Sequence, residues 1–322
     1  MRPESVAVSP DGARLYVTDS SSGQVLVLDS ATSAVLATVP VGNGPRGIVM
    51  SPNGARVYVA NLLSDTVSVL DTTSHTVVAT VPVGAEPCGV AVHLDGTRVY
   101  VANSLDSTLS VIATPTHTVV ATVLMGRGPL GVVLSPDGAR LYVANLLSAT
   151  VSVLSTATNA VVATIPMGTD TSGSPHRPYG IAMHPNGSRI YIANLLGTTI
   201  SVIDLATNTV VAAIPVGVGP DGSPHRPYGV ALHPDGSRIY IANLLSATIS
   251  VIDTTSNALI ATVPVGRSPR GVVVSSDGTK VYVANAGSAT ISVIDTGTNV
   301  VVATLAVGAG PVALDRDVVV PV

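Results

Sequence analysis

The sequence predicts an all-β fold, a seven-bladed β-propeller with four antiparallel strands per blade. Three observations predict it: a repeat of 42 or 49 residues, four strand patterns within each repeat, and a composition suited to strands. Of the 322 residues, 46% are hydrophobic and none is Phe or Trp, so Val, Ile, Leu and Ala must form the core. Chains whose apolar residues are mainly β-branched favour strands.

A tyrosine in a string like Tyr-Val-Ala-Asn marks each repeat. Its seven copies are spaced by 42, 42, 42, 49, 49 and 42 residues. The marker tyrosines are Tyr16, Tyr58, Tyr100, Tyr142, Tyr191, Tyr240 and Tyr282. A fixed period of this length, with several short strands in each unit, is the signature of a propeller.

The unit at residues 45–84 shows the strands that we expect in every blade. Turn residues separate the four strand patterns. The expected strands are Gly47–Ser51, Arg56–Ala60, Thr66–Leu70 and Thr76–Val83. The chain therefore divides into one propeller domain over residues 1–308 and a C-terminal tail over 309–322, which begins like another inner strand and is a candidate strand for the seam. The expected blades lie near 1–43, 44–85, 86–127, 128–169, 170–218, 219–267 and 268–308.

Four recurring strings carry a resemblance to a known family: Ser-Pro-Asp-Gly, Tyr-Val-Ala-Asn, Ser-Val-Ile-Asp-Thr and Val-Val-Ala-Thr-Val-Pro-Val-Gly. Over residues 3–308 they resemble the YVTN-type seven-bladed propeller repeat, which is also found in lactonase-like and surface-layer proteins. The resemblance implies that the first strand of each blade lines a central channel. It also implies ligand binding at the channel mouth on the face that carries the blade connections, here called the top. Such propellers serve as enzymes and as binding scaffolds, because a fold does not fix an activity.

Composition disfavours several other functions. The net charge of −4 and the 3% aromatic content argue against nucleic-acid binding. A single Cys excludes an internal disulfide framework and a Cys-based zinc site. No apolar run reaches the roughly 18 residues of a membrane span. No signal peptide is evident at the N-terminus, which predicts a cytoplasmic protein or a secreted one whose leader has been removed.

Residues that repeat in most blades are explained by the blade, so candidate site residues are those that do not repeat. The connections into blades five and six are each seven residues longer than the others, and both contain Gly-Ser-Pro-His-Arg-Pro-Tyr-Gly, at 173–180 and 222–229. This motif supplies His176, Arg177, Tyr179, His225, Arg226 and Tyr228. Histidine exchanges protons near neutral pH, and Arg binds carboxylate or phosphate. Duplication of a harmless loop is the alternative explanation.

A second candidate set occupies the position just before the first-strand glycine of each blade, which we expect to ring the channel entrance. This position reads Glu4, Arg46, Cys88, Leu130, Tyr179, Tyr228 and Arg270. Variety amid strong repetition suggests asymmetric use, although a tolerant exposed position gives the same pattern. Cys88 is better interpreted as a small apolar filler than as a nucleophile. Asp19 is a further candidate, because it replaces an Asn that we expect to cap the top turn of the other blades.

The top turns of four blades carry paired leucines, at 62–63, 146–147, 195–196 and 244–245. Packing between blades is the favoured interpretation, and an apolar rim for a protein partner is the alternative. No cofactor is predicted. A divalent metal held by His176 and His225 with Asp170 or Asp221 is a weaker possibility, since no motif with fixed ligand spacing is present.

The sequence thus favours a small-molecule site at the top of the channel, with lyase, cyclase or hydrolase chemistry as its catalytic form. His176, His225, Tyr179 and Tyr228 are the expected proton-transfer residues. The expected ligand-binding residues are Arg177, Arg226, Arg46, Arg270, Glu4, Asp19 and Cys88. The expected ligand is anionic with an apolar part. The alternative function is a non-catalytic scaffold for a protein or a surface glycan.

Overall fold

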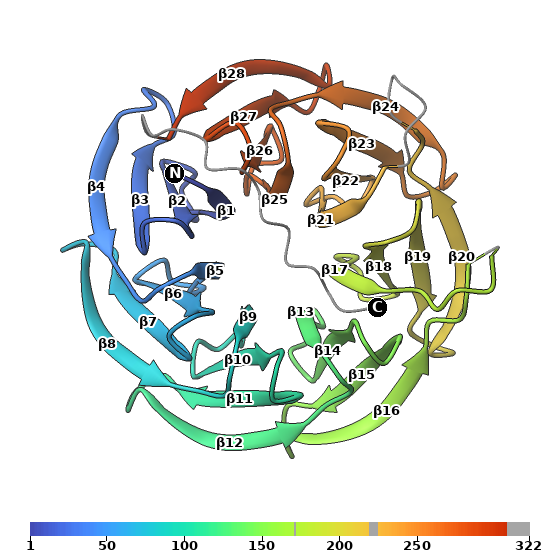
Figure 1. Cartoon of the computed structure of the whole chain (residues 1–322), viewed down its shortest axis with the longest axis horizontal. Helices are drawn as coiled ribbons and strands as arrows, with labels where there is room; N and C mark the ends of the chain where they lie inside the picture. The colour runs from blue at the N-terminus through green and yellow to red at the C-terminus, as the bar shows by residue number, and fades with distance from the viewer. Residues whose placement is uncertain (171, 219–224, 308–322) are drawn as a thin grey trace.

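The computed structural model describes residues 1–170, 172–218 and 225–307. These residues form seven four-stranded antiparallel sheets arranged in a ring around a central channel (Figure 1). Each sheet contains four strands that are consecutive in the chain, in the order β1-β2-β3-β4 and its equivalents. The predicted seven-bladed propeller is therefore confirmed, and the tail that was a candidate seam strand lies outside the described residues.

The innermost strand of every blade begins at a proline. Proline lacks an N–H and is tolerated as the first residue of a strand. The inner strands are β1 Pro3–Val8, β5 Pro45–Met50, β9 Pro87–Val92, β13 Pro129–Leu134, β17 Pro178–Met183, β21 Pro227–Leu232 and β25 Pro269–Val274. The common start fixes the residue after each proline at the same height in the channel.

The next two strands of each blade form its buried centre. Four consecutive residues are buried in every one of them, so each packs on both faces. The second strands are β2 Arg14–Asp19, β6 Arg56–Asn61, β10 Arg98–Asn103, β14 Arg140–Asn145, β18 Arg189–Asn194, β22 Arg238–Asn243 and β26 Lys280–Asn285. The third strands are β3 Gln24–Asp29, β7 Thr66–Asp71, β11 Thr108–Ala113, β15 Thr150–Ser155, β19 Thr199–Asp204, β23 Thr248–Asp253 and β27 Thr290–Asp295.

The outermost strand of each blade is largely exposed and carries a local register shift against the third strand. The outer strands are β4 Val35–Pro40, β8 Thr76–Pro82, β12 Thr118–Leu124, β16 Ala160–Pro166, β20 Thr209–Pro215, β24 Leu259–Pro264 and β28 Val300–Ala306. Hydrophobic clusters between neighbouring blades form the core. One such cluster joins Val6 and Leu15 of blade one to Tyr282 and Ile291 of blade seven, and so closes the ring.

Adjacent inner strands approach closely at the glycine that follows the mouth position. A Cβ atom on Gly89 would lie 1.9 Å from the carbonyl oxygen of Leu130, and one on Gly47 would lie 2.0 Å from that of Cys88. Only glycine fits such an approach. Blade one has Ser5 instead, and there the Thr18 hydroxyl contacts the backbone of both Ser5 and Arg46.

The asparagines at the ends of the second strands do not cap the top turns as we expected. The fully buried Asn61 donates from its amide to the hydroxyls of Thr66, at 3.0 Å, and Ser68, at 2.9 Å. All six asparagines make the same pair of bonds, which tie the second strand to the third. In blade one Asp19 does make the turn contact, since its carboxylate accepts from the backbone N–H of Ser21 at 3.2 Å.

Candidate functional site

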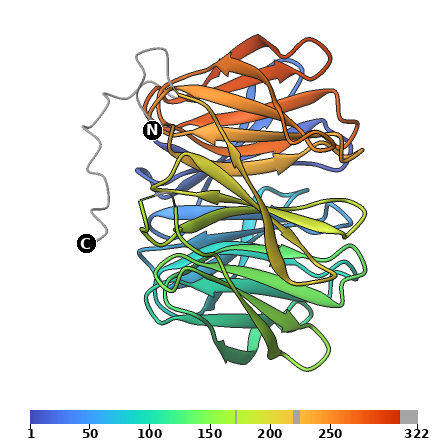
Figure 2. The same cartoon turned by 90° about the vertical axis from the view of Figure 1, so that its right-hand side faces the viewer.

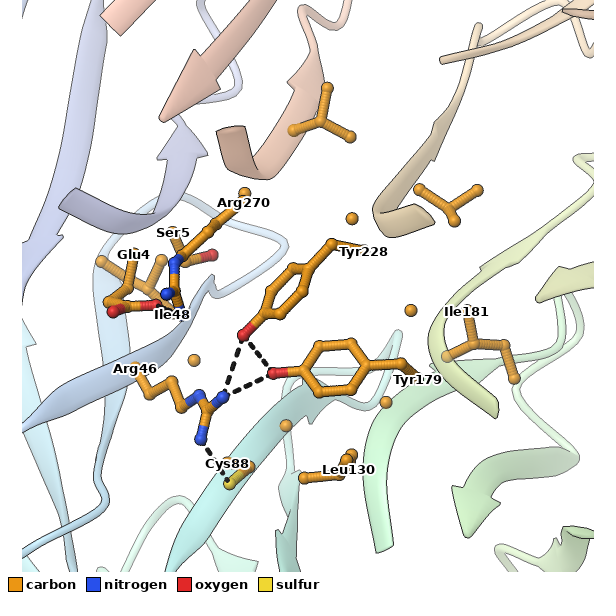
Figure 3. Close-up of a pocket in the computed structure, with 18 of the residues that line it drawn as sticks. Glu4, Ser5, Arg46, Ile48, Cys88, Leu130, Tyr179, Ile181, Tyr228 and Arg270 are labelled. Atoms are coloured by element: carbon orange, nitrogen blue, oxygen red, sulfur yellow. Dashed lines mark hydrogen bonds and ion pairs between the residues drawn. The ribbon is translucent and has the colours of Figure 1, made fainter. Parts of the chain in front are cut away.

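The seven non-repeating residues of the mouth position all line one cavity of about 310 Å³ in the central channel. The cavity lies at the start of the inner strands, toward the face that carries the N-terminus at the left of Figure 2. Figure 3 shows side chains from different blades directed toward one another across the channel. The ring of lining residues comprises Glu4, Arg46, Cys88, Leu130, Tyr179, Tyr228 and Arg270.

Arg46 is the centre of this ring. From blade two its guanidinium crosses the channel to blades five and six, where Nη2 donates to the hydroxyl oxygen of Tyr179 at 2.7 Å and of Tyr228 at 2.9 Å (Figure 3). Nη1 lies 3.9 Å from the Cys88 sulfur. Among the described residues, no carboxylate lies within ion-pairing distance of Arg46. The half-buried Arg46 guanidinium therefore contacts only neutral groups among these residues.

The cluster of Arg46, Tyr179 and Tyr228 contains one hydroxyl proton that its internal hydrogen bonds do not use. The hydroxyls of Tyr179 and Tyr228 also hydrogen-bond to each other, so one of the two phenols donates its proton to the other. Both hydrogens of Arg46 Nη2 are already donated, one to each phenol. Two phenols carry two hydroxyl protons, and the tyrosine pair uses one. The other proton has no acceptor within the cluster and can be donated to a ligand.

The protonation states of Arg46 and Tyr179 are consistent with the donation of a phenol proton to a ligand. Burial raises the pKa of Tyr179 well above its ordinary value of 10.0, and the nearby Arg46 cation offsets this only in part. Burial alone would lower the pKa of Arg46, but charge interactions with Tyr179, Tyr228, Cys88 and Glu4 outweigh it and raise the pKa well above its ordinary value. At neutral pH the cluster is thus a fixed cation beside a neutral phenol.

A second guanidinium lies on the Glu4 side of the ring. Arg270 is buried, with its Nη1 at 3.2 Å from a Glu4 carboxylate oxygen and its guanidinium carbon 5.4 Å from the Tyr228 ring centroid. The other Glu4 oxygen lies 3.0 Å from Nε of Arg2. Glu4 is the one carboxylate among the described residues that line the cavity, against two guanidinium groups. The polar part of the cavity therefore favours ligands with negative charge.

The opposite side of the ring is apolar. Cys88 and Leu130 are buried and pack with Leu146. Burial raises the pKa of the Cys88 thiol, and the Arg46 charge offsets this only in part, so the sulfur is held as a neutral thiol. This agrees with the interpretation of Cys88 as an apolar filler rather than a nucleophile.

Below the glycines, the cavity wall consists of branched aliphatic side chains, which we call the aliphatic layer. It contains one residue from every blade, each directly after the glycine position. The aliphatic layer comprises Val6, Ile48, Val90, Val132, Ile181, Val230 and Val272. Most of these side chains are half-buried and also pack into the clusters between blades, which fixes their positions.

The structure separates the histidines of the duplicated motif from its tyrosines. His176 and Arg177 line another cavity, of about 290 Å³, beside Asp170 and Leu196. His225 is fully buried, and its Nδ1 hydrogen-bonds to the carbonyl oxygen of Val216 at 3.0 Å. Neither histidine lines the channel cavity, so the expected convergence of all six motif residues on the mouth does not occur. Their catalytic role stays a prediction without support from position.

Two other predicted site residues lie away from the cavity wall. Asp19 is buried, and its carboxylate accepts from the backbone N–H of Arg2 at 2.7 Å. Burial opposes ionisation of Asp19, but hydrogen bonds from Arg2, Ser21 and Ser22 outweigh it and lower its pKa. Arg226 is half-buried and lines neither cavity.

Two further points concern the weaker possibility of a metal site and the presence of membrane-spanning helices. In the part of the chain that the structure describes, no three metal-ligating side chains cluster, and Asp221 lies outside that part. Residues 1–170, 172–218 and 225–307 contain no helix long and apolar enough to cross a membrane.

The two leucines of each top-turn pair differ in their exposure to solvent. The first of each pair is buried or half-buried, as Leu146 and Leu244 are, and packs inward. The second is exposed. The exposed positions are Leu63 at 70%, Leu147 at 44%, Leu196 at 54% and Leu245 at 52%, and Leu105 at 68% takes the same place in blade three.

Sequence reasoning missed Arg2 and the aliphatic layer. Arg2 lies one residue before the first inner strand, so no repeat position identified it. The aliphatic layer does have a sequence signal, because Val or Ile follows the mouth glycine, or Ser5 in blade one, in all seven blades. That uniformity was hidden among the many other repeated aliphatic positions.

The fold and the cavity together define a seven-bladed propeller with a cavity of small-molecule size at one end of its channel, which is lined by charged, polar and aliphatic side chains. The family model described as lactonase, 7-bladed beta-propeller, matches residues 1–164 and 169–301. The chain therefore belongs to the lactonase family of seven-bladed β-propellers. Among solved structures, a chain of hydrazine synthase from Kuenenia stuttgartiensis is similar, with 26% identity and a TM-score of 0.82 over 91% of this chain and 95% of that chain. No curated protein matches the sequence.

Proposed function

We propose that the protein binds a small anionic ligand in the channel cavity through Arg46, Tyr179 and Tyr228. The observation that carries the proposal is the Arg46 guanidinium, whose hydrogen-bond partners among the described residues are all neutral and which lies beside a phenol proton that the cluster does not use. Arg binds carboxylates and phosphates through two N–H groups, and such charge-assisted bonds are the stronger ones. An anion that enters the cavity would replace the hydrogen bonds of Arg46 to neutral tyrosines with stronger ones in which both partners are charged.

Hydrolysis of a cyclic ester is the catalytic form of this proposal that family membership supports. Water would add to the ester carbonyl, negative charge would develop on the carbonyl oxygen, and the ring C–O bond would break as a proton from the added water passes to the departing ring oxygen, which gives a hydroxy acid. Arg46 and the unused phenol proton would stabilise that oxygen, as oxyanion-hole donors do. The hydrazine synthase chain is a structural neighbour named for an enzyme, but its reaction is not transferred to this chain.

The test compares Arg46→Met with Arg140→Met, because both remove one guanidinium and Arg140 is exposed at the start of β14, at a repeated position that does not line the cavity. Calorimetric titration with small carboxylates and inorganic phosphate, together with a pH-stat assay on simple lactones, provides the readouts. We expect affinity or turnover to fall at least tenfold in Arg46→Met, since a hydrogen bond to a charged group contributes ~1.5–3 kcal/mol. Equal behaviour of both variants and the wild type would overturn the proposal.

The pH profile separates this cluster from the histidines. Arg46 stays protonated, Tyr179 stays a phenol and a carboxylate ligand stays ionised between pH 6 and 8, so carboxylate binding should be flat over that range. A loss of activity as pH falls through about 6.5, the ordinary pKa of histidine, would instead implicate His176 or His225 as a base.

A non-catalytic scaffold is the second candidate, and the exposed leucines on five successive blades favour it. Such a surface would hold a protein partner by apolar contact, with little dependence on salt. Leu63→Asp and Leu196→Asp should then weaken association, whereas Arg46→Met should leave it unchanged. The opposite pattern would exclude the scaffold.

A further inference from the structure

We infer that the ligand of the channel cavity is a short aliphatic carboxylic acid, or a lactone whose ring and chain are otherwise aliphatic, rather than a polyhydroxylated acid. The inference rests on the proposed function, because it takes the anionic head to lie at Arg46. The arrangement of polar and apolar groups along the channel carries it.

Polar side chains occupy one end of the cavity only. Apart from the mouth ring, Ser5 is the one lining residue with a polar side chain among those that the structure describes. The aliphatic layer contributes a branched hydrocarbon side chain from every blade. A ligand with its head at the mouth therefore places its remaining atoms against methyl groups.

This wall discriminates by chemistry. A methylene group gains free energy when it leaves water for such a surface. A hydroxyl group placed there loses its bonds to water, and the side chains of the aliphatic layer provide no replacement. The branched side chains cannot turn away to accommodate a polar group, because they also pack into the cores between blades.

The volume of the cavity limits the size of the ligand. At about 30 Å³ for each water-sized group, 310 Å³ holds on the order of ten non-hydrogen atoms. A carboxylate takes three of them and leaves room for a chain of about seven carbons. Affinity should thus rise with chain length and then fall once the cavity is full.

The experiment titrates the intact protein calorimetrically with straight-chain carboxylates from acetate to decanoate, and with gluconate as the hydroxylated counterpart of hexanoate. We expect affinity to rise three- to fourfold for each methylene up to about eight carbons in all, and hexanoate to bind more tightly than gluconate. Val132→Thr, which keeps the shape but adds a hydroxyl, should weaken octanoate several-fold and leave acetate unchanged. Val120→Thr, on the exposed outer strand β12, is the matched control.

Ile181→Val provides a variant that removes one methyl and introduces no polar group. It should shift the preferred chain to a longer acid, and its unfolding midpoint reports whether the fold is intact. Tighter binding of gluconate than hexanoate, or affinity that does not depend on chain length, would overturn the ligand class while the anion site stands. Failure of every carboxylate to bind, with Arg46→Met equal to wild type, would overturn the proposed function as well.

Discussion

The bottom turn and the mouth position each occur once in all seven blades, but their polar residues make different kinds of contact. In the bottom turn of blade four the aspartate contacts are local: the Ser135 hydroxyl donates to Asp137 at 2.5 Å, and the backbone N–H of Ala139 donates to the same carboxylate at 2.9 Å. At the mouth, Arg46 contacts residues 133 and 182 positions away in the chain. Polar groups satisfied within their own turn stabilise that turn, whereas polar groups satisfied across the channel belong to a shared site.

Positions that repeat should control stability without affecting ligand binding, and positions that differ among blades should control binding with little effect on stability. The mouth contains both kinds, since a repeated glycine follows the variable residue in six blades. The bottom turns vary less, and where Asn53 or Asn186 replaces the Asp of the turn it accepts the equivalent backbone N–H.

The largest effect on stability is expected from Gly89→Ala at the mouth. The new Cβ would lie 1.9 Å from the Leu130 carbonyl oxygen and force the inner strands apart, at a cost of about 3 kcal/mol. Gly96→Ala in a bottom turn meets nothing within 4 Å, and its positive φ of 73° costs about 1 kcal/mol. Urea unfolding of both variants measures the difference, and equal losses would contradict the close approach of the inner strands.

The next largest loss of stability is expected for Asn103→Ala, because it removes the amide that donates hydrogen bonds to Thr108 and Ser110 inside a blade. We expect a loss of about 2 kcal/mol in the free energy of unfolding and no change in ligand affinity. The exposed Asn43 provides the control for loss of an amide. A change in ligand affinity in Asn103→Ala would show that repeated positions also shape the site.

A smaller effect on stability is expected at the variable positions. In a double-mutant cycle of Arg46→Met and Tyr179→Phe, the coupling energy in unfolding should be about 1 kcal/mol, since the pair is only partly buried. Ligand titration of the same four proteins should show the larger response. Strict additivity in both measurements would mean that the contact across the channel is absent in solution.

The smallest effect is expected at the bottom turns and depends on pH. Hydrogen bonds from the backbone and hydroxyl of Thr97 lower the pKa of Asp95 from 3.8 to about 2. Its folded-state pKa lies below the unfolded value, so its contribution is present above pH 3.8 and is lost as pH falls toward 2. Asp95→Asn should reduce the drop in unfolding midpoint between pH 5 and pH 2, by a small amount because the residue is exposed.

Two other repeats already tolerate this substitution. They carry Asn53 and Asn186 at the same turn position, and each side chain accepts the equivalent backbone N–H. Asp95→Asn therefore keeps the turn geometry while it removes the charge. An unchanged acid response would assign the acid sensitivity to other carboxylates.

Sequence reasoning predicted the ring position and the residues that occupy it in all seven blades. The variety at that position identified the ring, and the duplicated motif singled out Tyr179 and Tyr228 within it. It did not distinguish the motif tyrosines, which line the channel cavity, from the motif histidines, which do not, because a loop sequence does not show which side chains face inward. Pro178 begins the inner strand, so Tyr179 is held at the mouth while His176 remains in the connection outside it.

The sequence by itself determined the propeller, its seven blades and the height at which the variable residues lie. These properties follow from periodicity and turn chemistry, which act over a few residues and are repeated seven times. Only the tertiary structure decided that Arg46 reaches the two tyrosines across the channel, and that one phenol proton remains available. Such contacts depend on the diameter of the closed ring and on which side chains are long enough to cross it, and neither can be derived from a single repeat.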